Sequence, residues 1–222
     1  MPKTLMFLHT SPVHIATFDQ LLAEIDPSIP AKHLVDEGLL RDARANGITA
    51  ELRQRITQTL VDAIADDAAV VVCTCSTIGG CAEQANHGTD RSIIRVDRAM
   101  AERAVAIGER IVVVAALVST LTPTRQLIEE VADQAGKAIA IFDVWCEAAW
   151  PYFERRDQSG YLAAVAACVR QSAPAGDVVV LAQASMAGAA ALCADLPIPI
   201  LSSPRLGLEA AIKAYHSADD LP

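Results

Sequence analysis

The chain has 222 residues, of which 52% are hydrophobic and 20% are charged, a length that allows one large or two small folded domains. Its 27 acidic residues outnumber its 18 lysines and arginines, and the formal net charge of −9 has the wrong sign for holding a phosphate backbone. The apolar runs fall far short of the roughly 20 residues that span a bilayer, and the N-terminus lacks the pattern of a signal peptide. We therefore expect a cytoplasmic protein that binds neither nucleic acid nor a membrane.

Short apolar runs alternate along the chain with longer stretches of helical periodicity. This alternation is typical of an α/β protein whose parallel sheets are covered by helices on both faces. The expected strands are residues 5–8, 33–35, 69–73, 93–96, 111–116, 138–142, 178–181 and 198–201. The expected helices include residues 18–25, 50–65, 98–108, 124–135, 161–171 and 206–215.

The two halves of the chain resemble each other. The valine triplets 70–72 and 178–180 are each followed by a polar loop, so that Cys75 and Gln183 correspond at a separation of 108 residues. Two further pairs of expected strands repeat at separations of 107 and about 106 residues. A period this long indicates a duplicated βα unit of four strands rather than a solenoid.

The loop after the third expected strand carries the most informative chemistry. Residues 70–80 read Val-Val-Val-Cys-Thr-Cys-Ser-Thr-Ile-Gly-Gly, which places Cys75 where a strand turns into a helix. Ligands of parallel α/β sheets bind beyond the carboxyl ends of the strands. The partial positive charge of a helix N-terminus stabilises a thiolate, so we expect a reactive Cys75 with a lowered pKa.

The six cysteines, at positions 73, 75, 81, 146, 168 and 193, form no regular framework. In a reducing compartment they are expected to be free thiols, most of them small core residues. Metal binding by Cys73, Cys75, Cys81 and His87 is disfavoured, because the paired CxxC spacing is absent. The Gly-Lys-Ser/Thr signature of a phosphate-binding loop is also absent.

Three segments carry recognisable motifs: Cys-Ser-Thr at residues 75–77, Ser-Thr-Leu-Thr-Pro-Thr at residues 119–124 and Leu-Ala-Gln-Ala-Ser-Met-Ala at residues 181–187. They resemble the aspartate/glutamate/hydantoin racemase superfamily. Residues 75–77, Cys-Ser-Thr, are similar to the first cysteine loop of that family. Residues 181–187, Leu-Ala-Gln-Ala-Ser-Met-Ala, are similar to its second loop, where Gly-Cys-Ala-Gly-Met-Ala is common in the hydantoin racemase branch. Residues 119–124 are similar to its threonine-rich carboxylate-binding loop, and the resemblance spans nearly the whole chain.

The resemblance implies a fold, a division into domains and a class of reaction. The fold would consist of two similar flavodoxin-like halves, each with a parallel four-stranded sheet, related by a pseudo-twofold axis with the active site in the cleft between them. The first domain would comprise residues 1–97 and 204–222, with the C-terminal helix on the first half, and the second would comprise residues 98–203. The enzyme would need no cofactor, would act on a small carboxylate-bearing substrate and could form a homo-oligomer.

Gln183 stands where the family has its second cysteine. Racemisation in this family uses one cysteine to remove the α-proton and a second to return a proton, whereas a neutral amide has no proton to exchange near neutral pH. Several alternatives stay open: a racemase whose second base is another group, for which His9 is a candidate, a decarboxylase, a cis–trans isomerase with a cysteine nucleophile, and a non-catalytic metabolite-binding protein.

The candidate site residues lie at expected strand ends, except Thr124, which ends the threonine-rich segment 119–124. Cys75, Gln183 and His9 are the candidate catalytic residues, and the others supply hydroxyl or backbone donors that a carboxylate needs. The candidate substrate-binding residues are Thr10, Ser11, Ser76, Thr77, Ser119, Thr120, Thr124, Ala184, Ser185 and Ser202. No metal ligands are expected among them.

Overall fold

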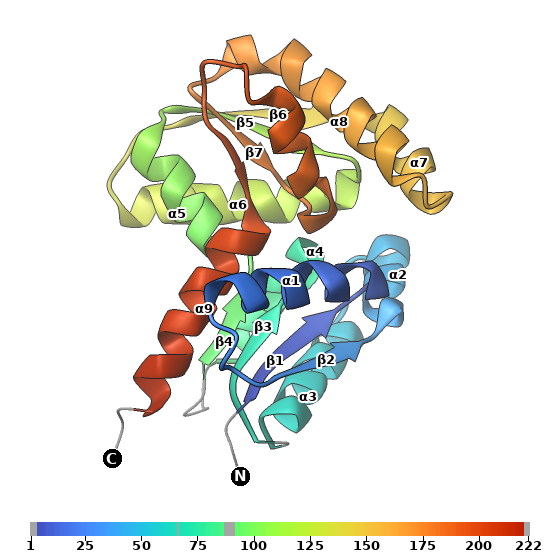
Figure 1. The fold of residues 1–222 in the computed structure, drawn as a ribbon, viewed down its shortest axis with the longest axis vertical. Helices are drawn as coiled ribbons and strands as arrows, with labels where there is room; N and C mark the ends of the chain where they lie inside the picture. Colours follow the sequence, from blue (N-terminus) through green and yellow to red (C-terminus); the bar gives the residue numbers. More distant parts are fainter. Residues whose placement is uncertain (1–3, 66, 87–91, 220–222) are drawn as a thin grey trace. The chain divides into compact units, whose positions relative to one another are not determined.

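The structure is a computed structural model that describes residues 4–65, 67–86 and 92–219. It divides into two compact units, Met1–Val96 with Pro204–Pro222, and Asp97–Ser203 (Figure 1). Each unit contains a parallel four-stranded sheet, of order β2-β1-β3-β4 in the first and β6-β5-β7-β8 in the second. The predicted α/β fold with two parallel four-stranded sheets is thus confirmed, and the matching strand orders agree with the repeat found in the sequence.

The first sheet consists of β1 (Thr4–His9), β2 (Ala31–Val35), β3 (Ala68–Cys73) and β4 (Ser92–Arg95). Strands β1 and β3 are buried along their whole length, and for this reason they read as continuous apolar runs rather than as alternating patterns. The edge strand β2 is much more exposed.

Helices cover both faces of this first sheet. One face packs against α2 (Glu37–Asn46), α3 (Ala50–Ala65) and α4 (Ser76–Gln84), with Leu39, Ile56 and Leu60 in the core. The other face packs against α1 (Ile15–Ile25) and α9 (Ser203–Asp219). Helix α9 contributes Leu208, Ala211, Ile212 and Tyr215 to the core that contains Leu5, Phe7 and Phe18.

The second sheet consists of β5 (Arg110–Ala115), β6 (Ala140–Trp145), β7 (Val178–Leu181) and β8 (Ile200–Ser202). Its helices are α5 (Arg98–Ile107), α6 (Val118–Gln134), α7 (Trp150–Glu154), α8 (Gln158–Ser172) and the 3₁₀ segment η4 (Ala184–Cys193). Strand β7 is buried along its length, and Tyr161 of α8 is the largest fully buried side chain in the described part of the chain.

Several elements differ from those expected. Helix α6 begins at Val118, so residues 119–124 belong to its first turns and not to a loop, although Pro123 lies among them. Strand β6 spans Ala140–Trp145 instead of residues 138–142. Helix α2 was missed because only Leu39 and Ala43 are buried in an otherwise polar segment, which leaves a weak periodic signal. Among the described residues, no helix has the length and apolar character of a membrane span.

Candidate functional site

Cys75 lies in the short connection between β3 and α4. Its backbone is extended, with φ −110° and ψ 111°, and it occupies the N-cap position of α4, which begins at Ser76. The backbone N–H of Ile78 donates to the Cys75 carbonyl at 3.3 Å. The sequence placed this strand end and helix start correctly.

The Cys75 sulfur is surrounded by hydrogen-bond donors. Its partners are the hydroxyls of Thr10 and Thr77 and the backbone N–H groups of Thr77 and Ile78. The N–H of Thr77 is among those that the first turn of a helix leaves without an intrahelical acceptor, and the N–H of Ile78 is shared between the sulfur and the Cys75 carbonyl. This set of donors, together with the helix dipole, stabilises negative charge on the sulfur.

The pKa of the Cys75 thiol is nevertheless raised, because burial penalises the thiolate more than the four hydrogen bonds stabilise it. The expected lowered pKa is therefore corrected. The helix N-terminus alone would lower the pKa of this thiol, but the loss of hydration at the end of a buried strand raises it, and this burial is not visible in a sequence. At rest, Cys75 is a protonated thiol. Once the proton is lost, the thiolate accepts hydrogen bonds from these four donors.

His9 lies at the end of β1 and is fully buried. Its Nδ1 is 2.8 Å from Thr74 Oγ1 and its Nε2 is 2.9 Å from His33 Nδ1, so both ring nitrogens have partners. His33 in turn reaches Asp19 at 2.9 Å. Burial, reinforced by the charges of His33 and His14, lowers the pKa of His9 to about 3, and the ring is neutral near pH 7.

The other candidates of the first unit lie close to the Cys75 loop in the chain. Thr10 and Ser76 are buried and Thr77 is half-buried, with Ser76 and Thr77 opening α4. Ser11 is half-buried at the N-cap of a short 3₁₀ turn, Pro12–His14. The structure thus brings Thr10 and Thr77 to the sulfur.

Gln183 occupies in the second unit the position that Cys75 occupies in the first. It follows β7, has an extended backbone with φ −120° and ψ 136°, and is the N-cap of η4. Its side-chain oxygen accepts hydrogen bonds from the backbone N–H groups of Ala116 and Leu117, at 2.6 and 3.2 Å. The side chain therefore holds the end of β7 to the connection between β5 and α6.

The first turns of α6 carry buried hydroxyl groups. Thr120 and Thr124 are buried, and Ser119 is half-buried. Within the described part of the chain, Ser119 Oγ and Thr124 Oγ1 have no hydrogen-bond partner, as is also true of Ser203 Oγ. A buried hydroxyl without a partner costs about 1–3 kcal/mol, and a ligand oxygen would remove this cost.

The remaining candidates of the second unit differ in their surroundings. Ser185 Oγ lies 2.8 Å from the hydroxyl of Tyr161, so its side chain already has a partner in the core of the unit. Ala184 is buried at the start of η4, and Ser202 is half-buried at the end of β8.

Sequence reasoning missed four residues of these networks. Thr74, His33 and Asp19 complete the contacts of His9, and Tyr161 binds Ser185. The sequence predicted the strand that contains His33. It did not predict that this strand lies beside β1, because the neighbours in a sheet depend on its strand order. Within residues 4–65, 67–86 and 92–219, no cluster of three or more histidine, cysteine or acidic side chains could hold a metal ion, and His87 lies outside these residues.

Several solved structures match the fold of this chain. Glutamate racemase from Francisella tularensis subsp. tularensis SCHU S4, in complex with D-glutamate, matches with a TM-score of 0.76 at 14% identity, over 99% of this chain and 83% of its own. Aspartate racemase from Picrophilus torridus matches with a TM-score of 0.75 at 11% identity, over 96% and 94%. An unliganded arylmalonate decarboxylase matches with a TM-score of 0.59 at 12% identity, over 96% and 92%. No protein-family profile and no curated protein matches the sequence.

The chain therefore has the two-unit α/β fold of the aspartate and glutamate racemases. Because a decarboxylase has the same fold, the fold by itself does not decide between racemisation and loss of carbon dioxide.

Proposed function

We propose that this protein is a cofactor-independent enzyme that acts on a small carboxylate-bearing substrate with Cys75 as its reactive group. The observation that carries the proposal is the set of four donors around the Cys75 sulfur, at the N-terminus of a helix and the carboxyl end of a parallel strand. A structural core cysteine needs no such donors. The likeness to racemases of aspartate and glutamate, the latter in complex with D-glutamate, supports a small amino acid or dicarboxylate as the substrate. The resemblance of residues 181–187 to the hydantoin racemase branch adds hydantoins to the candidates.

Because the pKa of Cys75 is raised, the resting enzyme carries a protonated thiol, which favours Cys75 as a proton donor. In this mechanism, the S–H bond breaks as the proton passes to a carbanionic carbon of the substrate. The thiolate left behind accepts hydrogen bonds from Thr10, Thr77 and Ile78, and a proton from water then restores the thiol.

The fixed side chain of Gln183 supports proton delivery from one side. Its oxygen is held by Ala116 and Leu117, which leaves the amide NH₂ as a hydrogen-bond donor that does not exchange protons near neutral pH. This favours a second candidate, decarboxylation of a substrate with two carboxylates on one carbon. The electrons of the broken C–C bond form an enediolate, carbon dioxide leaves, and Cys75 protonates one face.

The carboxylate would be bound by hydroxyl and backbone donors. The hydroxyls of Ser119 and Thr124, which lack partners within the described residues, support a role for α6 in this binding. Ser11, Ser76, Thr120, Ala184, Ser185 and Ser202 complete the proposed set, with His9 behind the loop as a neutral, doubly hydrogen-bonded imidazole.

The test is deuterium incorporation and turnover measured by NMR, with a panel of amino acids, hydantoins, dicarboxylates and malonates in deuterated water. We expect at least one substrate class to react, and Cys75→Ser to lower the rate by about 10³-fold or more. Cys81→Ala, in the same helix but outside the donor cluster, is the matched control and should retain activity. A protein that binds a compound of this panel in calorimetry yet converts none would instead be a metabolite-binding protein.

A further inference from the structure

The outer edge of β2 is the feature of the first unit that the proposed activity does not use. Strand β2 pairs with β1 on one side only. Pro30 O accepts from Leu5 N, and Asp36 N donates to His9 O, so residues 30 and 36 direct their backbone groups toward β1. Because this direction alternates along a strand, the N–H and C=O groups of Ala31, His33 and Val35 point outward.

These outward backbone groups have no hydrogen-bond partner within the described part of the chain. The corresponding edge strand of the second unit, β6, is different. There the Arg125 guanidinium donates to the outward carbonyl of Ile141 at 3.0 Å and to the Asp143 carboxylate at 2.8 Å, and so blocks part of the edge. An edge strand that is neither covered nor blocked is a template for pairing with another strand.

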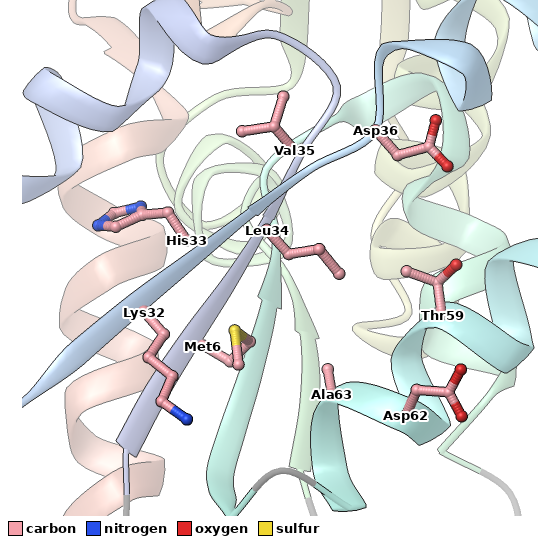
Figure 2. Close-up of a pocket in the computed structure, with 9 residues that line it drawn as sticks. All are labelled: Met6, Lys32, His33, Leu34, Val35, Asp36, Thr59, Asp62 and Ala63. Carbon is pink, nitrogen blue, oxygen red and sulfur yellow. The ribbon is translucent and has the colours of Figure 1, made fainter.

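One face of β2 also lies over a hollow instead of a packed core. The hollow has a volume of about 570 Å³ and lies between β2 and α3, with Thr59, Asp62 and Ala63 on the helix side (Figure 2). Lys32, Leu34 and Asp36 line it from the strand. Leu34 and Val35 are 38% and 37% exposed, which is high for apolar residues of a strand.

We infer that β2 is the docking edge for a second copy of this chain, paired antiparallel about a twofold axis at Leu34. In this register Leu34 lies opposite itself, and His33 of each copy lies opposite Val35 of the other, where outward-pointing backbone groups exchange N–H···O=C bonds. Lys32 of each copy lies opposite Asp36 of the other. The strand is therefore complementary to itself in charge, and this identifies a second copy as the occupant.

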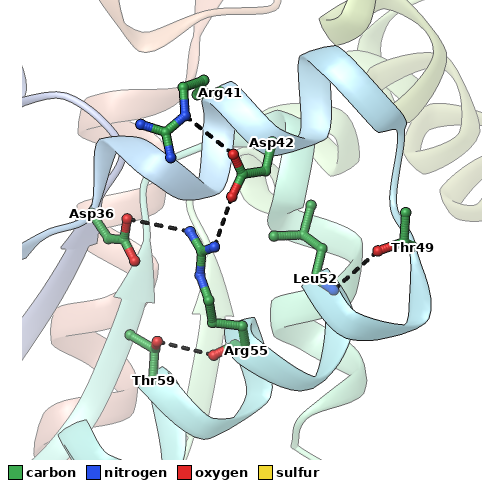
Figure 3. Close-up of polar contacts among 7 residues, drawn as sticks. All are labelled: Asp36, Arg41, Asp42, Thr49, Leu52, Arg55 and Thr59. Atoms are coloured by element: carbon green, nitrogen blue, oxygen red, sulfur yellow. Dashed lines mark hydrogen bonds and ion pairs between the residues drawn. The ribbon is translucent and has the colours of Figure 1, made fainter.

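The intramolecular contacts of Asp36 leave it available for this pairing. Arg55 is 2.7 Å from Asp42 but 3.5 Å from Asp36, so its stronger ion pair is with Asp42 (Figure 3). The Asp36 carboxylate lines the hollow and is only loosely tied to the helix below it.

The first test reverses the charges and measures the dimerisation constant by sedimentation. Lys32→Asp and Asp36→Lys each place like charges opposite each other in both pairs, and each should weaken the dimer about 10-fold or more. An equimolar mixture of the two variants should restore it, because both pairs of the mixed dimer are then attractive. Lys213→Asp, on the exposed side of α9, and Asp133→Lys are the matched controls and should change nothing.

The second test does not depend on how well the charge variants fold. Residues opposite each other in a non-hydrogen-bonded antiparallel pair have Cα atoms about 4.5 Å apart, which suits a disulfide. Leu34→Cys should therefore form a cross-linked dimer under mild oxidation, whereas Phe142→Cys, on β6, should not. A monomer at all concentrations, or a dimer that neither responds to charge reversal nor cross-links at residue 34, would overturn the inference. Activity is not a readout in either test, so the proposed function is tested separately.

Discussion

The side-chain oxygen of Gln183 lies 2.6 Å from the backbone nitrogen of Ala116, in the connection between β5 and α6. A second hydrogen bond, from the N–H of Leu117, fixes which end of the amide points there, because only the carbonyl oxygen accepts. Gln183 thus ties the loop after β7 to the connection between β5 and α6. Substitutions at this position are expected to change both stability and chemistry.

We predict that Gln183→Ala lowers the free energy of unfolding by about 1–3 kcal/mol, because it leaves the N–H groups of Ala116 and Leu117 without their acceptor. Gln183→Glu keeps an acceptor oxygen and should cost less. Urea denaturation of the three proteins at pH 7 measures the difference. Equal stabilities for all three would contradict the role of the side chain as a tie.

We predict that the wild-type protein does not appreciably racemise aspartate, glutamate or simple hydantoins, because Gln183 cannot transfer a proton. Gln183→Cys introduces an acid/base group, and slow exchange of the α-proton with deuterated water is the expected gain, at some loss of stability. NMR detects the exchange, with Gln183→Ala as the control for the altered loop. Efficient wild-type racemisation would show that another group serves as the second base.

Much of the fold could be predicted from sequence, whereas the electrostatics of the site could not. The buried strands β1, β3, β5 and β7 can be predicted because they are continuous apolar runs. Cys75 can be placed at a strand end because the apolar run of β3 stops just before it. The pKa of Cys75 depends on burial by residues distant in the chain. The partners of His9 depend on strand order: β2 lies beside β1, which brings His33 to within 2.9 Å of it.

Alkylation at limiting iodoacetamide tests the state of Cys75. Its thiol is protonated near pH 7, whereas the pKa of half-buried Cys168 is lowered by the side-chain hydrogen bond between its sulfur and that of Cys146. We therefore predict that Cys168 is labelled before Cys75 at pH 7, the reverse of the order that the helix N-terminus alone implies. Peptide mass spectrometry measures both rates, and labelling of Cys75 should accelerate above pH 9.

Thr10→Val provides the control for this assignment. The change removes one donor to the thiolate, so it should raise the pKa of Cys75 further and slow its alkylation, while Thr10→Ser should preserve the rate. Labelling of Cys168 should be the same in all three proteins. Faster alkylation of Cys75 in Thr10→Val would mean that the hydroxyl shields the sulfur rather than stabilising its charge.

Gly207 sets how closely α9 approaches the first sheet. A Cβ atom at this position would overlap the backbone carbonyl of Val96, which cannot move aside as a flexible side chain would. We predict that Gly207→Ala lowers the free energy of unfolding by about 2–3 kcal/mol, through displacement of α9 from its core contacts. Lys213→Ala, exposed on the same helix, should change it by less than about 0.5 kcal/mol in the same urea titration.

The histidines of the first unit predict how stability depends on pH. Burial lowers the pKa of His9 to about 3 and that of His14 to about 4, from 6.5. As the pH falls from 6.5 toward 4, the unfolded chain therefore binds protons that the folded chain does not, and the free energy of unfolding decreases. Each histidine contributes up to about 1.4 kcal/mol per pH unit, since a pKa shift between the two states is a stability difference.

His14→Gln removes the contribution of His14 and leaves the hydrogen bonds of His9 to Thr74 and His33 in place. Burial, the largest cause of the lowered pKa of His9, also remains. We predict that the free energy of unfolding falls less steeply between pH 6 and pH 4.5 in the variant than in the wild type, with its slope against pH reduced by up to about half. Above pH 7.5 His14 is neutral in the folded and in the unfolded chain. The difference in the free energy of unfolding between the two proteins should therefore stop changing there. Urea titrations at intervals of half a pH unit give the slopes. Parallel curves across the acidic range would show that His14 ionises in the folded protein as readily as in the unfolded chain.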